Sequence, residues 1–121
     1  MNRKELINQC MDYIMQHLDE ELSLEIVADR FYMSKYHFGR IFKEETGETL
    51  YAFIKRCKID QSAIDMKLNP ARAITDIGLD YGYSSSNYSS VFRKHHDISP
   101  AMFRKSIPLD SMQVPFARER V

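Results

Sequence analysis

The sequence predicts an all-α fold of about seven helices, in two similar halves joined by a long helix. Apolar residues recur at spacings of three and four along almost the whole chain, which is the period of an amphipathic helix. The alternation of β-branched residues that marks strands is weak. A block of about 30 residues recurs 50 positions later with its residue classes kept, which indicates a duplicated unit.

Length and composition limit the class of protein. The chain has 121 residues, of which 44% are hydrophobic, enough for a modest core in one domain or two very small ones. No stretch approaches the roughly 18 to 20 apolar residues of a membrane span, and the N-terminus lacks the apolar segment of a signal peptide. We therefore expect a cytoplasmic protein with no membrane partner, in which Cys10 and Cys57 are reduced and partly buried.

The first half of the chain predicts three helices, over 3–19, 24–31 and 34–45. Their apolar residues keep the helical spacing, and Ser34 is a suitable N-cap for the third. Gly47 suits the left-handed position that ends a helix.

The second half opens with a longer helix over 50–67, which Asn69 and Pro70 interrupt because proline cannot continue a helix. Three shorter helices follow, over about 73–80, 84–95 and 100–105. After them, residues 106–121 contain two prolines and no periodicity, and we expect a tail or a linker to a domain that this chain lacks.

The repeat aligns one helix pair with the other. At a shift of 50, Phe38 meets Tyr88, and Phe42 meets Phe92. Each copy is a short helix, a turn of three or four residues and a second helix of about twelve residues, which is the order of a helix-turn-helix motif. Small residues at the equivalent positions Ala28 and Gly78 allow the paired helices to approach closely.

The expected organisation is therefore two helix-turn-helix subdomains joined by a long linker helix. We assign four segments in chain order: an N-terminal helix-turn-helix subdomain, the remainder of the linker helix, a C-terminal helix-turn-helix subdomain, and the tail. Their ranges are 1–57, 58–68, 69–105 and 106–121.

Charge is unevenly distributed, although the net charge is zero. A neutral total by itself argues against a nucleic-acid-binding protein. Residues 1–50 carry six basic and ten acidic side chains, whereas residues 51–105 carry nine and five. The stretch from Ser34 to Lys43 has three basic side chains and no acidic one. A local basic face can thus exist within a neutral chain.

The second helix of each copy has an outer face free of acidic residues. On the first copy this face is predicted to hold Lys35, Tyr36, His37, Gly39, Arg40 and Lys43. On the second copy it is predicted to hold Ser85, Ser86, Asn87, Ser89, Ser90, Arg93 and Lys94. Arginine, asparagine and serine suit base edges in a DNA major groove, and the basic residues near the helix ends suit phosphates.

Plainer interpretations of these residues stay open. A polar helix face is often only solvated, although two acid-free copies at equal spacing weaken that interpretation. Tyr36 is also consistent with a packing residue, and His37 with an ordinary surface histidine.

Metal sites and catalytic sites are not expected. His95 and His96 are adjacent on a predicted helix, so we expect their rings to point in different directions, with no third or fourth ligand at a suitable spacing. The sequence has no Ser-His-Asp order, glycine-rich phosphate loop or paired-carboxylate pattern. We therefore predict no metal, no cofactor and no enzymatic activity.

Two stretches resemble the DNA-binding domain of the AraC/XylS family of bacterial transcription regulators. They are VADRFYMSKYHFGRIFKEETGETLYAFI and IGLDYGYSSSNYSSVFRKHHDISPAMFRK. The resemblance covers about residues 5–105 and implies that the helices at 34–45 and 84–95 enter successive major grooves on one DNA face. It also implies that six residues face the bases: Tyr36, Gly39, Arg40, Ser86, Asn87 and Ser90. Ser90 stands where the family commonly has a basic residue, and Gly39 has no side chain. We therefore expect recognition of the DNA sequence to depend more on Arg40 and on DNA shape.

The expected function is that of a sequence-specific DNA-binding transcription regulator. Its partners would be double-stranded DNA, RNA polymerase and an effector domain outside this chain. The alternative is a helical protein-interaction adaptor without DNA binding. A small-molecule sensor has little support because the sequence has no β-rich ligand-binding segment. DNA binding that weakens steeply with salt separates the first two hypotheses.

Overall fold

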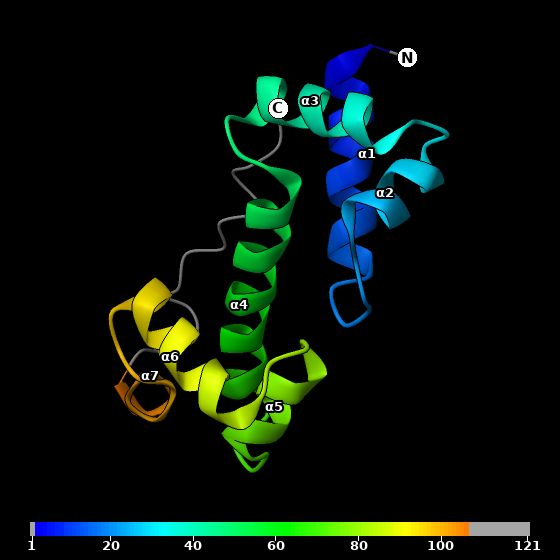
Figure 1. Cartoon of the computed structure of the whole chain (residues 1–121). Helices are drawn as coiled ribbons and strands as arrows, with labels where there is room; N and C mark the ends of the chain where they lie inside the picture. Colours follow the sequence, from blue (N-terminus) through cyan, green and yellow to red (C-terminus); the bar gives the residue numbers. More distant parts are fainter. Residues whose placement is uncertain (1, 107–121) are drawn as a thin grey trace. The chain divides into compact units, whose positions relative to one another are not determined.

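The computed structural model describes residues 2–106, and the elements of that part of the chain are all helices (Figure 1). The helices are α1 (Arg3–Gln16), α2 (Leu24–Arg30), α3 (Lys35–Thr46), α4 (Leu50–Leu68), α5 (Ile74–Asp80), α6 (Ser85–His96) and α7 (Pro100–Ser106). The all-α prediction is therefore confirmed. The predicted tail lies almost entirely outside the described residues.

The described chain forms two compact units, which divide within α4. The first unit holds residues 2–57 and the second holds residues 58–106. The α4 helix itself is continuous across this division, from Leu50 to Leu68. No helix among the described residues is long and apolar enough to cross a membrane.

The core of the first unit is built from apolar faces of its helices. Ile7 and Ile14 of α1, Val27 of α2 and Phe38 of α3 are fully buried. The Phe42 ring of α3 meets the Phe53 ring of α4 edge-on, with centroids 5.4 Å apart. These contacts fix the inner side of α3, so its opposite side is left outward.

The second unit repeats this arrangement around α6. Tyr88 and Phe92 of α6 are fully buried, and Phe92 packs edge-on against Phe103 of α7 at 5.4 Å. The Tyr88 hydroxyl donates to Ser62 Oγ of α4 at 2.7 Å, and Ser62 in turn donates to the Ile59 carbonyl at 2.6 Å. This hydrogen-bonded chain satisfies two buried hydroxyls, as burial requires.

Both helix-turn-helix turns use the same backbone hydrogen bonds. Met33 N donates to Ala28 O at 3.0 Å, and Tyr83 N donates to Gly78 O at the same distance. In both copies a serine opens the second helix: Ser34 Oγ accepts from His37 N and Ser84 Oγ from Asn87 N, each at 3.3 Å. The duplication inferred from the sequence is therefore a duplication of backbone structure.

The close approach predicted for Gly78 is confirmed. A Cβ atom at this position would lie 2.5 Å from Cγ of the buried Tyr88 ring, which is closer than real carbon contacts allow. Only glycine lets α5 and α6 pack at this separation. Ala28, at the equivalent position of the first unit, is also fully buried.

The first helix ends earlier than predicted, at Gln16 instead of residue 19. His17 leaves the helical conformation with φ −129°, and its ring Nδ1 lies 2.7 Å from the Tyr13 carbonyl oxygen. Leu18 is nevertheless buried, with 4% of its surface exposed. The apolar spacing thus continues past the helix because the following loop returns Leu18 to the core.

Candidate nucleic-acid interface

The outward side of α3 carries most of the residues predicted for the first copy. Burial of Phe38, Ile41 and Phe42 sets the rotation of this helix. The exposed members of the predicted set are Tyr36, His37, Arg40 and Lys43. Tyr36 is 79% exposed, so it is not the packing residue that was the alternative interpretation.

Lys35 is half-buried and already has an anionic partner. Its Nζ lies 3.0 Å from Glu25 Oε1 of α2 and 5.3 Å from the centroid of the Tyr36 ring. The hydrogen bond and charge of Glu25 raise the pKa of Lys35 above its ordinary value. A phosphate would have to compete with this carboxylate for the ammonium group.

Arg40 and His37 contact each other along the same exposed face. Arg40 Nη2 lies 3.2 Å from His37 Nδ1. Arginine has only donors, so the histidine nitrogen is the acceptor in this pair. The contact holds the guanidinium of Arg40 beside α3 while leaving its other donors available.

Gly39 faces a different direction from its exposed neighbours. A Cβ atom there would lie 3.2 Å from Leu24 Cδ2, so the position is turned toward α2. Gly39 is accordingly half-buried. Its contribution to the outer surface is limited to backbone.

The outward side of α6 carries every residue predicted for the second copy. Tyr88 and Phe92 face inward, and Val91 is half-buried. The exposed residues are Ser85, Ser86, Asn87, Ser89, Ser90, Arg93 and Lys94. Within residues 2–106, neither Arg93 nor Lys94 has an acidic ion-pair partner. The face combines short polar side chains with two available cations near the end of the helix.

The two adjacent histidines at the end of α6 do not behave as predicted. The Nε2 atoms of His95 and His96 lie 2.9 and 3.6 Å from the same oxygen, Oδ1 of Asp60 in α4. The expectation that their rings point in different directions was therefore wrong. Asp60 is 35 residues away from His95 in the sequence, so local spacing carried no signal of it.

The environment of this cluster, defined as Asp60, His95 and His96, is largely desolvated. Asp60 is 6% exposed. Burial, followed in size by the proximity of His95, lowers the pKa of His96 below its ordinary value.

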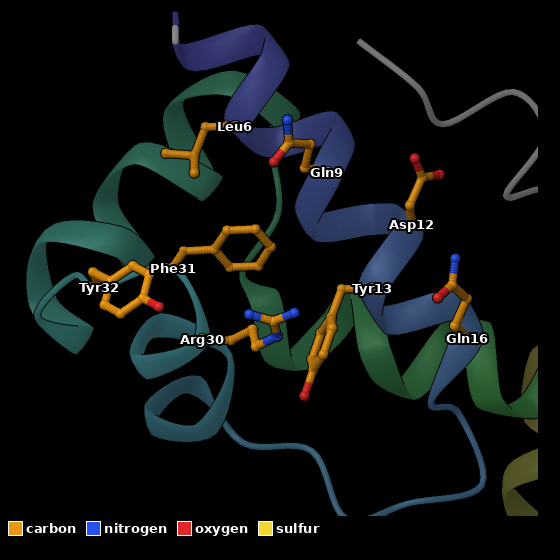
Figure 2. Close-up of a pocket in the computed structure, with 8 residues that line it drawn as sticks. All are labelled: Leu6, Gln9, Asp12, Tyr13, Gln16, Arg30, Phe31 and Tyr32. Carbon is orange, nitrogen blue, oxygen red and sulfur yellow. The ribbon is translucent and has the colours of Figure 1, made fainter.

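A separate pocket of about 460 Å³ lies between α1 and the end of α2 (Figure 2). Tyr13 projects into it from α1, with the Arg30 guanidinium 5.6 Å from its ring centroid. The α3 residues predicted to bind DNA do not line this pocket. It is thus distinct from the outward face of α3.

Tyr32 is an exposed aromatic residue that the sequence did not single out. It lies in the turn between α2 and α3, with 94% of its surface exposed and a φ of +59°. The equivalent position of the second copy is Gly82, with φ +86°. The alignment of a tyrosine with a glycine was the available signal, because glycine is favoured where φ is positive.

Comparison with protein families identifies the repeated region. The model of a family described as "Helix-turn-helix domain" matches residues 27–106. The match includes both turns and both exposed helices.

Several characterised regulators are similar in sequence. Transcriptional regulator Rob of Salmonella typhimurium and the right origin-binding protein of Escherichia coli K12 are each 35% identical over 107 residues. The match covers 88% of this chain but only 37% of the length of those relatives. Regulatory protein SoxS of Salmonella typhimurium is 30% identical over 105 residues, which cover 86% of this chain and 97% of SoxS.

Solved structures share the fold. The C-terminal domain of AraT, a response regulator from Geobacillus stearothermophilus, superposes with a TM-score of 0.73 at 23% identity, over 89% of this chain and 90% of that one. A regulator from Chromobacterium violaceum described as an AraC-type DNA-binding protein gives a TM-score of 0.74 at 22% identity, over 84% and 90%. From the family match and the similarity to Rob and SoxS, the chain belongs to the AraC/XylS family of helix-turn-helix transcription regulators.

Proposed function

We propose that the chain recognises a specific duplex DNA sequence by inserting α3 and α6 into successive major grooves. The family is one of DNA-binding transcription regulators. The observation that carries the proposal is the pair of outward helix faces that present basic and polar side chains, in two units with the same backbone hydrogen bonds. The exposed acidic residue of α3, Glu44, follows these side chains and is paired with Arg3. Acidic groups at these positions would repel phosphates.

The proposed contacts divide into base contacts and phosphate contacts. Arg40 is assigned to a base edge because its guanidinium can fork onto guanine. Asn87 is assigned to adenine for the corresponding reason. Lys43, Arg93 and Lys94 lie toward the ends of their helices and are assigned to phosphates, which fix register without reading sequence.

Not every residue of the predicted set has the same role in this proposal. Tyr36, His37, Ser85, Ser86, Ser89 and Ser90 supply exposed surface that a groove can contact. Lys35 would reach a phosphate only by leaving Glu25, so its contribution is expected to be small. Gly39 would act through close approach of the backbone.

Further partners belong to the proposal as well. We propose that the chain contacts RNA polymerase, acts in the cytoplasm without enzymatic activity, and works with an effector domain outside this chain. The similarity to Rob and SoxS supports a role in transcription.

The first test is selection of bound sequences from a random duplex pool, followed by titration of the selected site at several salt concentrations. The proposal predicts that the logarithm of the affinity falls linearly with the logarithm of salt, by about 0.9 for each phosphate contacted. A protein-interaction adaptor would select no sequence and show no duplex affinity.

Arg40→Ala tests the base contact. The substitution is expected to cost about 1 to 3 kcal/mol on the selected site and to relax preference at one base pair. The matched control is Arg30→Ala, which removes an exposed arginine of the same unit that stacks on Tyr13 instead of facing outward with α3. An equal loss on all sequences would reassign Arg40 to a phosphate contact.

A further inference from the structure

We propose that Asp60, His95 and His96 bind a divalent transition metal ion of the zinc class. The cluster lies within the second unit, where α4 supplies the carboxylate and the end of α6 supplies both imidazoles. This inference concerns a site apart from the outward face of α6 and does not depend on DNA binding.

The three side chains converge with a spacing that suits one ion. One ligand atom from each residue lies within 4.8 Å of the other two. Asp60 Oδ1 is 2.9 Å from His95 Nε2 and 3.6 Å from His96 Nε2. A tetrahedral zinc ion with bonds of about 2.0 to 2.1 Å separates its ligands by about 3.3 Å, which lies between these two distances.

Two buried polar atoms of the cluster lack a partner. Asp60 Oδ2 and His96 Nε2 are inaccessible to solvent and make no hydrogen bond. Leaving such atoms unsatisfied is costly in a folded protein, so each calls for an explanation. A bound cation would satisfy His96 Nε2, and it would also satisfy Asp60 Oδ2 if the carboxylate bound through both oxygens, whereas the hydrogen bond between His95 and Asp60 Oδ1 accounts for neither.

The ring of His96 is held in place by packing against two aromatic rings. Its centroid lies 4.4 Å from that of Phe92 and 5.6 Å from that of Phe103. The unpartnered Nε2 atom of this ring lies 3.6 Å from Asp60 Oδ1.

The donor set favours a particular class of ion. Two imidazoles and one carboxylate suit zinc, cobalt, nickel or copper, whereas magnesium and calcium prefer oxygen ligands. Neither Cys10 nor Cys57 belongs to the second unit, so the cluster has no thiolate ligand. Access is from the side of His95, whose side chain is 30% exposed. The fourth position would be filled by water.

The consequence for the molecule is a cross-link between α4 and the end of α6. The ion would hold the last turn of the exposed helix to the helix behind it. Because only the folded state brings Asp60 and the two histidines together, binding would stabilise the second unit.

The direct test is titration of the untagged full chain with cobalt(II), followed by its visible absorption. We expect a visible ligand-field band that saturates at one ion per chain. His95→Gln and His96→Gln are each expected to weaken binding at least about 100-fold, since even the outer-shell partners of metal ligands contribute about 10- to 100-fold. His37→Gln is the matched control, because His37 is an exposed histidine of the other unit, and it should leave the titration unchanged.

A second measurement protects the test against loss of folding in the variants. Zinc should raise the Tm of the wild type and of His37→Gln in a concentration-dependent way, but it should not raise the Tm of His95→Gln. The His95→Gln chain is expected to fold because the side chain at this position is partly exposed. Three results would overturn the proposal. They are the absence of any cobalt band, an intense near-ultraviolet band from thiolate ligation, and binding that survives both cluster substitutions. The cluster would then be a hydrogen-bonded structural feature only.

Discussion

At the scale of single residues, the two copies differ most where the backbone has a positive φ. The turn position is Tyr32 in the first copy and Gly82 in the second, and the helix-ending position is Gly47 in the first and Asp97 in the second. Each copy therefore places one non-glycine residue in the left-handed region, which costs a residue with a side chain about 1 to 2 kcal/mol. The sequence predicted the left-handed position of Gly47, whereas Tyr32 and Asp97 could be found only from their alignment with Gly82 and Gly47 of the other copy.

Tyr32→Gly should therefore stabilise the first unit by about 0.5 to 1 kcal/mol. The side chain is 94% exposed, so little packing is lost. The conformational penalty that a tyrosine pays at φ +59° is removed, and this gain is larger than the cost of the extra chain entropy of glycine. Gly82→Ala at the matched position should cost about 1 kcal/mol, because alanine meets the same conformational penalty. Chemical denaturation of both variants measures the two effects. A loss of more than about 1 kcal/mol for Tyr32→Gly would mean that the tyrosine contributes packing or binding energy that its exposure conceals.

A second pair of glycines separates helix propensity from packing. Gly78→Ala gains about 1 kcal/mol of propensity, but its Cβ would lie 2.5 Å from the ring of buried Tyr88, so overpacking of about 1 to 3 kcal/mol or more should prevail. Gly39→Ala meets only the flexible end of Leu24 at 3.2 Å and should be neutral or stabilising. Thermal unfolding should therefore show a lower Tm for Gly78→Ala and an equal or higher Tm for Gly39→Ala, each relative to the wild type. Equal destabilisation by both would contradict the difference in packing.

At the scale of elements, periodicity and capping residues predicted the helices well. The apolar residues of α3 and α6 continue at helical spacing from a serine N-cap, so both the position and the inward face of each helix could be derived locally. The end of α1 was less accurate because apolar spacing does not distinguish a helix from a loop that returns Leu18 to the core. The convergence of α6 histidines on Asp60 could not be predicted, since it depends on the packing of α6 against α4.

Phe92→Ala should destabilise the second unit by about 3 to 5 kcal/mol. The ring is fully buried and contacts Tyr88 and Phe103 with centroids 5.8 and 5.4 Å away, so its removal leaves a cavity between α6 and α7. Val91→Ala is the control from the same helix, since Val91 is half-buried and its truncation should cost much less. Hydrogen exchange resolved by segment should show the loss in residues 58–106. A near-wild-type exchange pattern would contradict the placement of Phe92 in that core.

At the scale of the whole molecule, a net charge of zero conceals the distribution that matters for function. The first 50 residues are acidic overall, yet the outward side of α3 is basic and polar up to Lys43, and the exposed Glu44 that follows is paired with Arg3. Two outward helix faces in one chain would let a monomer read a site longer than a single helix can contact. The site would also be asymmetric, because α3 and α6 differ in sequence.

Hydroxyl-radical footprinting of the full chain on its selected duplex tests this central claim most directly. The account predicts two protected segments about 10 base pairs apart, one for each exposed helix, at a stoichiometry of one chain per site. Asn87→Ala combined with Arg93→Ala should weaken one segment while the other persists. A single protected segment in the wild type, or two segments that require two chains, would contradict it.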